Sequence, residues 1–133
     1  MDIAHYADRA WGLIYTRAYH EKLVEKYLKN SGIPVYLPCL YKNRSKYHRS
    51  KSPMFKSYLF AAWNKNDRIA LHSCSSIASF METPLDGDTK IIEQLERLSQ
   101  LEELSKSMEI RLRKKDFPFK KLLLNNHQIS KAE

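Results

Sequence analysis

The sequence predicts an α+β fold: a small, mostly antiparallel sheet flanked by helices, in the order β-α-β-β-α-β-α. Short aromatic and β-branched runs alternate along the chain with two longer segments whose apolar residues recur every three or four positions. Apolar residues make up 43% of the 133-residue chain, which is sufficient for a single modest core. Strands and helices that alternate on this scale form layers, with the helices packed on the sheet.

The first strand and the first helix are expected between residues 11 and 31. Residues 11–16 are aromatic and β-branched, as is typical of a strand partly covered on both faces. Gly32 is expected to end the following helix near Asn30 in a left-handed conformation, with Ile33 folding back on the last turn. The helix itself is predicted from an apolar stripe at helical spacing within residues 17–31, formed by Leu23, Val24, Tyr27 and Leu28.

The centre of the chain alternates between apolar and basic segments. Residues 35–38 are a second strand candidate, in which Pro38 belongs at an end or an edge because it lacks a backbone donor. Residues 42–52 contain no acid and are expected to form a loop or the tip of a β-ribbon. Residues 54–63 give the strongest strand pattern, and apolar side chains on both faces predict a central strand. One face is expected to carry Phe55, Ser57, Leu59 and Ala61, and the other Met54, Lys56, Tyr58 and Phe60.

The second half of the chain begins with a polar break and continues into a long helix. Residues 64–67 are expected to cap a short helix over residues 68–73. A strand over residues 77–81 and a turn over residues 84–88 follow. A long amphipathic helix is expected from Thr89, because apolar residues recur there at helical spacing: Ile91, Ile92, Leu95, Leu98, Leu101, Leu104 and Met108.

The end of the chain is expected to leave the folded domain. The solvent-facing side of the long helix is expected to carry Glu102, Glu103 and Lys106. Ile110 and Leu112 alternate with charged residues and are expected to form one last short strand. We therefore place a single domain over residues 1–110 and a polar, weakly ordered tail over residues 111–133.

Composition and motifs argue against an enzyme, a membrane protein and a secreted protein. No apolar run approaches the roughly 18 residues of a membrane span, and the N-terminus is no signal peptide, so we expect a cytoplasmic protein. Cys39 and Cys74 lie in no metal-binding pattern and are expected to be free thiols. The histidines are scattered, and no nucleophile, zinc or phosphate-loop motif occurs. We expect no catalytic residue, no metal and no cofactor.

Three segments together resemble the NGN domain of NusG-type transcription factors. Residues 11–22 (W-x-x-x-YTR, then HEK) are similar to the first strand of that domain and the start of its first helix. Residues 32–38 (GIPVYLP) resemble its passage into the second strand, and residues 53–60 (PMFKSYLF) its Pro-Leu-Phe-x-x-Tyr-x-Phe strand. The resemblance spans about residues 11–101. It is closest to specialised paralogs of the RfaH type and to the antitermination factors of capsule operons.

The resemblance implies a transcription elongation or antitermination factor that acts as a monomer. Factors of this type grip the two clamp helices of the largest subunit of bacterial RNA polymerase and lie beside upstream or non-template DNA. The family normally adds a C-terminal KOW barrel, whose tight turns need glycine. The last glycine of this chain is Gly87, so we expect the KOW barrel to be absent.

The resemblance also implies a polymerase-binding groove around the central strand. Tyr58 and Phe60 would be its aromatic anchors, because helices docked in grooves are held by large apolar side chains. Trp11 and Tyr15 would flank the groove, whereas Phe55 would point to the opposite face, into the core. Periodicity alone favours plain core for Tyr58 and Phe60, and burial explains Trp11 and Tyr15 equally well.

A second polymerase contact is implied at His72 and Ser73. These two residues begin a hydroxyl-rich stretch, residues 72–76, that loosely resembles a His-Thr-Thr-Thr element that touches the polymerase gate loop. A capping turn is the structural alternative, because serine caps helices well.

The basic segment of residues 42–51 is the candidate DNA-binding site. A net charge of +8 indicates a polyanionic partner, since clustered cations gain by displacing counterions from phosphates. The cations of this segment are Lys42, Arg44, Lys46, Arg49 and Lys51. They would contact phosphates of upstream DNA with little base readout. A solvated loop is the alternative, but five cations without an acid favour DNA.

Three functional hypotheses remain open on the sequence. The first is the polymerase-bound elongation factor. The second is a free-standing nucleic-acid-binding domain that uses residues 42–51, with Tyr41 and Tyr47 as stacking platforms for bases. The third is a protein-interaction module that dimerises through its long Leu-rich helix around Leu98.

Overall fold

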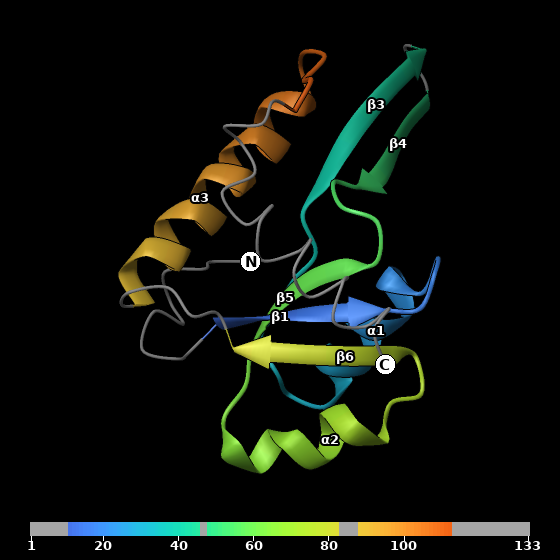
Figure 1. The fold of residues 1–133 in the computed structure, drawn as a ribbon. Coiled ribbons are helices and arrows are strands. Elements are labelled where there is room, and N and C mark those ends of the chain that lie inside the picture. Colours follow the sequence, from blue (N-terminus) through green and yellow to red (C-terminus); the bar gives the residue numbers. More distant parts are fainter. Residues whose placement is uncertain (1–10, 46–47, 83–87, 113–133) are drawn as a thin grey trace, which may run out of the picture.

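The computed structural model describes residues 11–45, 48–82 and 88–112, and only the backbone of residues 43–45, 48–49 and 88–90. The expected α+β class is confirmed (Figure 1). The elements in these ranges are β1 (Trp11–Thr16), α1 (Glu21–Asn30), β2 (Val35–Tyr36), β3 (Cys39–Ser45), β4 (His48–Pro53), β5 (Tyr58–Ala62), the 3₁₀ helix η2 (Lys65–Asp67), α2 (Arg68–Ser73), β6 (Ile77–Glu82) and α3 (Asp88–Ser105).

The main sheet has four antiparallel strands in the order β2-β5-β1-β6. Two β-α-β units interlock in this arrangement, so β1 and β5 lie at the centre and both α1 and α2 connect non-adjacent strands. β5 is therefore the central strand that the sequence predicts. β3 and β4 pair with each other in a separate two-stranded sheet. Along the chain, this hairpin lies between β2 and β5, which are neighbours in the main sheet.

Apolar side chains alternate along the central strands and so form a core on each face of the sheet. On β1, Ile14 packs towards α1 and α2, whereas Leu13 packs towards α3. On β5, Leu59 and Phe60 divide in the same way. All four side chains are 0% exposed, so the two cores stabilise the same pair of strands from opposite sides.

The end of α1 follows the prediction from local sequence. Gly32 has a φ of 74°, and its N–H donates to the Lys29 carbonyl at 3.1 Å. The Ile33 N–H donates to the Leu28 carbonyl at 2.9 Å, which folds the chain back onto the helix. A cap is present at residues 64–67, since Asn64 forms a capping box with Asp67, but it caps η2, and α2 has no side-chain cap of its own within the described ranges.

The strand expected over residues 54–63 starts later, and its first part turns. Ser57 has a φ of 67°, in the left-handed region, and this residue breaks the alternation of side chains. Phe55 therefore lies in the same core as Phe60, with ring centroids 6.4 Å apart, and the prediction that it faces away is wrong. Glu21 supports the turn, because its Oε1 accepts the Ser57 N–H at 2.9 Å.

Two further expectations change in the structure. The basic segment is a β-ribbon, the second of the two forms expected for it, so the described residues contain two strands more than the predicted order. The strand expected at Ile110 and Leu112 is wrong, since residues 109–112 have no regular secondary structure. The predicted turn before α3 and most of the predicted tail lie outside the described residues.

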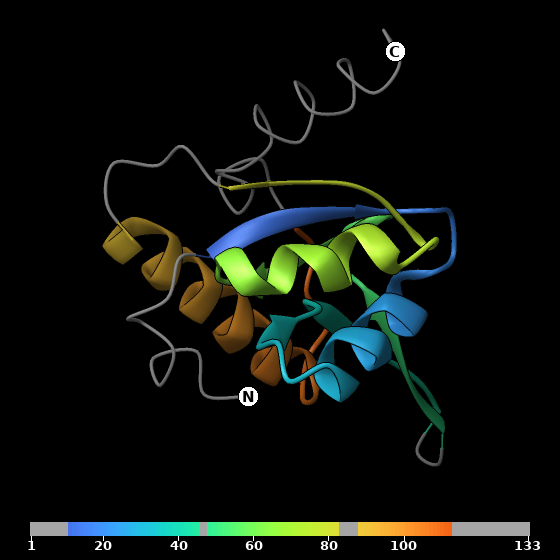
Figure 2. The same ribbon diagram turned by 90° about the horizontal axis from the view of Figure 1, so that it is seen from below.

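α3 and the β3–β4 hairpin lie on the same side of the sheet in Figure 1, away from α2. Figure 2 shows the hairpin projecting from the body of the domain close to α1. Lys22 on α1 lies there, with its ammonium 3.5 Å from the Lys51 carbonyl of β4. The fold thus presents a sheet face under α3 and, next to it, a projecting basic hairpin.

Candidate functional site

The face of the sheet under α3 is covered unevenly. The strand register places Tyr36, Phe60, Leu13 and Met81 in one row across β2, β5, β1 and β6. Phe60 and Leu13 are completely buried and Tyr36 is 8% exposed, whereas Met81 at the edge strand is partly exposed. The row is therefore covered at β2, β5 and β1, and its end at β6 is left more open.

Several apolar side chains that pack against the α3-side core are not fully covered. Tyr15 and Tyr58 lie side by side, with ring centroids 5.1 Å apart and planes tilted by 35°. We call the group the open corner; its members are Tyr15, Met54, Tyr58, Met81 and Leu101. Tyr58 is 9% exposed, and the other four are partly exposed side chains packed against the α3-side core.

The open corner is an uncharged surface. Burial, and then the neighbouring Tyr15, raises the pKa of Tyr58, so its phenol stays neutral at physiological pH. Ser79 lies opposite Tyr15 on β6, and its Oγ is buried without a hydrogen-bond partner among the described residues. The corner thus offers aromatic and aliphatic surface.

The six predicted polymerase-binding residues do not form one site. Trp11 and Phe60 are 1% and 0% exposed, so the expected open groove at Phe60 is filled by the core under α3. These two side chains support the open corner from below, and Tyr15 and Tyr58 belong to it. His72 and Ser73 lie apart from them, on α2, which packs against the other face of the sheet.

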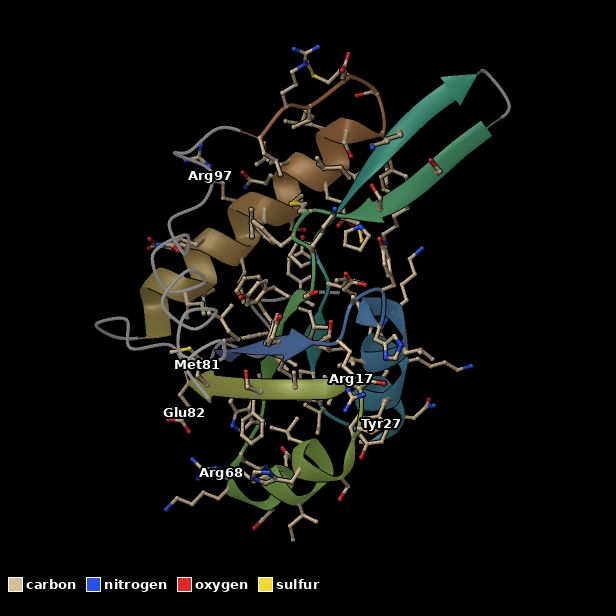
Figure 3. The ribbon with its side chains drawn as sticks, turned by 45° about the vertical axis from the view of Figure 1, so that its right-hand side comes forward. Arg17, Tyr27, Arg68, Met81, Glu82 and Arg97 are labelled. Atoms are coloured by element: carbon tan, nitrogen blue, oxygen red, sulfur yellow. The ribbon has the colours of Figure 1, made fainter. Side chains whose placement is uncertain are left out.

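The surroundings of His72 are a shallow hollow with both polar and apolar lining. The His72 ring lies 5.0 Å from that of Phe80 in an edge-to-face arrangement, and Ser73 donates its hydroxyl to the Ile69 carbonyl at 2.7 Å. The hollow has a volume of about 430 Å³ and is lined by Leu71, His72, Ile77, Ala78, Ser79 and Phe80. Beyond Phe80, Arg68 of α2 and Glu82 of β6 form an ion pair at 3.3 Å (Figure 3).

The hairpin carries the predicted DNA-binding segment. Lys42 and Lys51 are exposed on it, and the side chains of Arg44, Lys46 and Arg49 lie outside the described residues. The Tyr41 ring is flanked by two ammonium groups, Lys51 at 5.8 Å and Lys106 at 5.5 Å from its centroid. Tyr41 is thus engaged in cation–π contacts, which disfavours its predicted use as an open stacking platform for bases.

Glu102 and Ser105 are functional candidates that the sequence analysis missed. Glu102 was expected on the solvent side of α3, but its Oε1 accepts the Cys39 N–H at 2.8 Å. The Ser105 Oγ accepts the Tyr41 N–H at 2.9 Å, and Ser105 is 1% exposed. The available signal was the spacing from Leu98, because residues four and seven positions later continue the same helix face.

The described part of the chain contains no competing site. The leucines expected to mediate dimerisation pack inside the domain, where Leu95 is 0% and Leu98 1% exposed. Within the described ranges, no group of three His, Cys, Asp or Glu side chains is arranged to hold a metal ion. No helix in these ranges is both long and apolar enough to cross a membrane. Cys39 and Cys74 are free thiols, as expected.

The fold and these surfaces define a small α+β domain with apolar side chains on one face of its sheet and a projecting basic hairpin. The family model described as "NusG: Transcription termination factor nusG" matches residues 9–102, well over half of the chain. The chain therefore belongs to the NusG family of transcription factors, which confirms the family resemblance of the sequence.

Other comparisons add less. A search of curated proteins finds no match. The chain is similar to a solved structure described as "Domain interaction in Thermotoga maritima NusG", with 19% identity and a TM-score of 0.48. The match covers 78% of this chain and 66% of that one, so the chain spans just under two thirds of that protein's length.

Proposed function

We propose that this protein is a transcription elongation or antitermination factor that binds the clamp helices of the largest RNA polymerase subunit through the open corner. The hairpin then lies along upstream or non-template DNA. The observation that carries the proposal is the uneven cover of the α3-side face, which leaves Tyr15 and Met81 partly exposed in a domain of the NusG family. In this proposal the protein acts in the cytoplasm and as a monomer; the burial of Leu95 and Leu98 inside the domain supports the monomer.

The chemistry of the open corner suits a pair of amphipathic helices. Such helices bury apolar side chains at i, i+3 and i+4 positions, and a groove for them needs fixed apolar anchors. The paired rings of Tyr15 and Tyr58 are large and are held by the packed core beneath them. Leu101 contributes from α3, so the surface has a sheet floor and a helical wall.

Two further contacts complete the proposed complex. His72 and Ser73 would meet a polymerase loop on the α2 side of the sheet, where the hollow beside Phe80 is open to a small side chain. The cations Lys42, Arg44, Lys46, Arg49 and Lys51 would contact DNA phosphates along the hairpin. A domain touching polymerase at two faces and DNA with a third element would bridge parts of the transcription complex.

The test is the affinity of the full chain for a clamp-helix fragment, measured by isothermal titration calorimetry. We expect Tyr15→Ala to weaken binding by about 10- to 100-fold, as expected for loss of an aromatic hot spot. We expect Leu101→Glu to weaken it further, because the substitution places a charge in an apolar interface.

The matched control is Leu23→Glu, which adds the same charge at a 59% exposed leucine of α1. This variant should bind like the native protein. Native affinity in both Tyr15→Ala and Leu101→Glu would rule out the open corner as the docking surface. If the fragment does not bind while duplex DNA alone binds tightly, the free-standing nucleic-acid-binding domain is the better assignment.

A further inference from the structure

The free edge of β3 is closed by side chains of α3. β4 pairs with one edge of β3, and among the described residues no strand pairs with the other. Cys39 and Tyr41 are two residues apart, so their N–H groups point to the same edge. Glu102 Oε1 accepts from Cys39 at 2.8 Å and Ser105 Oγ accepts from Tyr41 at 2.9 Å. Two side chains one turn apart thus replace a neighbouring strand.

The same carboxylate also reaches the second strand of the hairpin. Glu102 Oε2 lies 3.9 Å from the ammonium of Lys51 on β4. Lys51 and Lys106 in turn lie 5.8 Å and 5.5 Å from the centroid of the Tyr41 ring. One acidic side chain therefore contacts both strands of a basic hairpin, and a lysine of α3 adds a cation–π contact.

The Ser105 hydroxyl is well placed for its contact. The side chain is 1% exposed, and its own proton is donated to the Glu102 carbonyl at 2.5 Å. This leaves a lone pair of Oγ for the Tyr41 N–H. A buried hydroxyl with both its donor and acceptor functions used is a fixed contact rather than a mobile surface one.

α3 is firmly attached to the rest of the domain. Leu95 and Leu98, on the same side of the helix as Glu102, are buried in the core that contains Phe60. Leu101, between them and Ser105, belongs to the open corner. A single helix therefore connects the open corner with the hairpin.

We propose that Glu102 and Ser105 are positioning residues that hold the β3–β4 hairpin at a fixed orientation relative to the open corner. Their role is to aim the cations of the hairpin, so that DNA lies in one place relative to a partner bound at the corner. The positioning itself stands on the geometry above; its consequence for DNA rests on the proposed function.

The test compares Glu102→Ala, Ser105→Ala and the conservative variant Glu102→Gln in the full chain. Amide hydrogen exchange of β3 and residual dipolar couplings of the hairpin are measured by NMR, with the amides of β1 and β5 as internal controls. In Glu102→Ala we expect the Cys39 amide to exchange roughly tenfold faster or more, because a hydrogen bond to a charged acceptor is lost. We also expect the hairpin to lose the alignment it shares with the sheet.

Glu102→Gln should restore slow exchange and alignment, because the amide oxygen still accepts the Cys39 N–H. Ser105→Ala should speed exchange at Tyr41 while β1 and β5 stay unchanged. The proposal is overturned if both alanine variants keep native exchange and alignment in the hairpin. It is also overturned if exchange rises equally in β1 and β5, which indicates general destabilisation, or if Glu102→Gln behaves like Glu102→Ala.

Binding of a 20-base-pair DNA duplex to the same variants separates this inference from the proposed function. We expect Glu102→Ala to bind more weakly than Glu102→Gln, because both variants remove the same negative charge beside Lys51 and only the alanine variant releases the hairpin. If Lys42→Ala binds DNA as well as the native chain and the exchange results hold, the assignment of the hairpin to DNA fails while the positioning role stands.

Discussion

Gly12 lies where β1 passes closest to its neighbours. A Cβ at this position would collide with the indole ring of Trp63 and lie 2.7 Å from the Met81 carbonyl oxygen. We predict that Gly12→Ala destabilises the domain by about 1–3 kcal/mol, the usual cost of adding a methyl group to a packed site. Denaturant unfolding followed by fluorescence measures this loss.

The collision with the indole ring can be tested by making the ring smaller. In Gly12→Ala/Trp63→Phe, the double variant should lose less stability than the sum of the two single losses, because the smaller ring leaves room for the methyl group. Strict additivity would show that the loss in Gly12→Ala does not come from a collision with the indole ring.

One buried thiol and two buried phenols make the stability of the domain fall at alkaline pH. Burial is the main cause that raises the pKa of Cys39 to about 11, and burial likewise raises the pKa of Tyr36 and Tyr58. The folded chain keeps these protons at pH values where the unfolded chain loses them. For the Cys39 thiol, the free energy of unfolding is unaffected by this difference below pH 9, the ordinary pKa of the thiol. It falls as the pH rises from 9 to about 11, because only the unfolded chain then loses the proton.

We therefore predict that the free energy of unfolding falls between pH 9 and 11. Cys39→Ala should flatten this dependence by up to about 2 kcal/mol, although it lowers stability at neutral pH. Urea unfolding at pH 8, 9, 10 and 11 provides the comparison. An unchanged pH dependence in the variant would mean that Cys39 titrates normally in the folded chain.

At the level of elements, local signals in the sequence were sufficient where the determinant is local. The end of α1 follows from Gly32, and the start of η2 follows from Asn64. The turn before β5 could not be predicted, because Ser57 adopts its left-handed backbone with support from Glu21, 36 residues earlier in the chain. For this reason Phe55 was assigned to the wrong face.

The candidate site was predictable to the same extent. The sequence places Tyr58 and Phe60 on one face of a strand, and the structure agrees. Their exposure depends on where α3 lies across the sheet, which periodicity does not specify. Phe60 was expected to be exposed and is buried, whereas Glu102 was expected to face solvent and instead contacts the protein. A carboxylate on a helix is normally solvated, but here it closes the edge of β3.

For the whole molecule, the net charge of +8 is unevenly distributed over the described surface. α1 and the hairpin present exposed lysines, including Lys22, Lys26 and Lys42, whereas α3 presents the exposed acids Glu93 and Glu103. A polyanion would approach the α1 and hairpin side, and the apolar open corner would stay free of it.

The most direct test of the proposed function is an NMR titration of the isotope-labelled chain with a fragment containing the polymerase clamp helices. We predict that chemical shift changes concentrate at Tyr15, Tyr58, Met81 and Leu101, and spare Leu23 on α1 and Ile69 on α2. Changes confined to α1 or α2, or no changes at a saturating concentration of the fragment, would contradict the proposal that the open corner is the polymerase-binding surface.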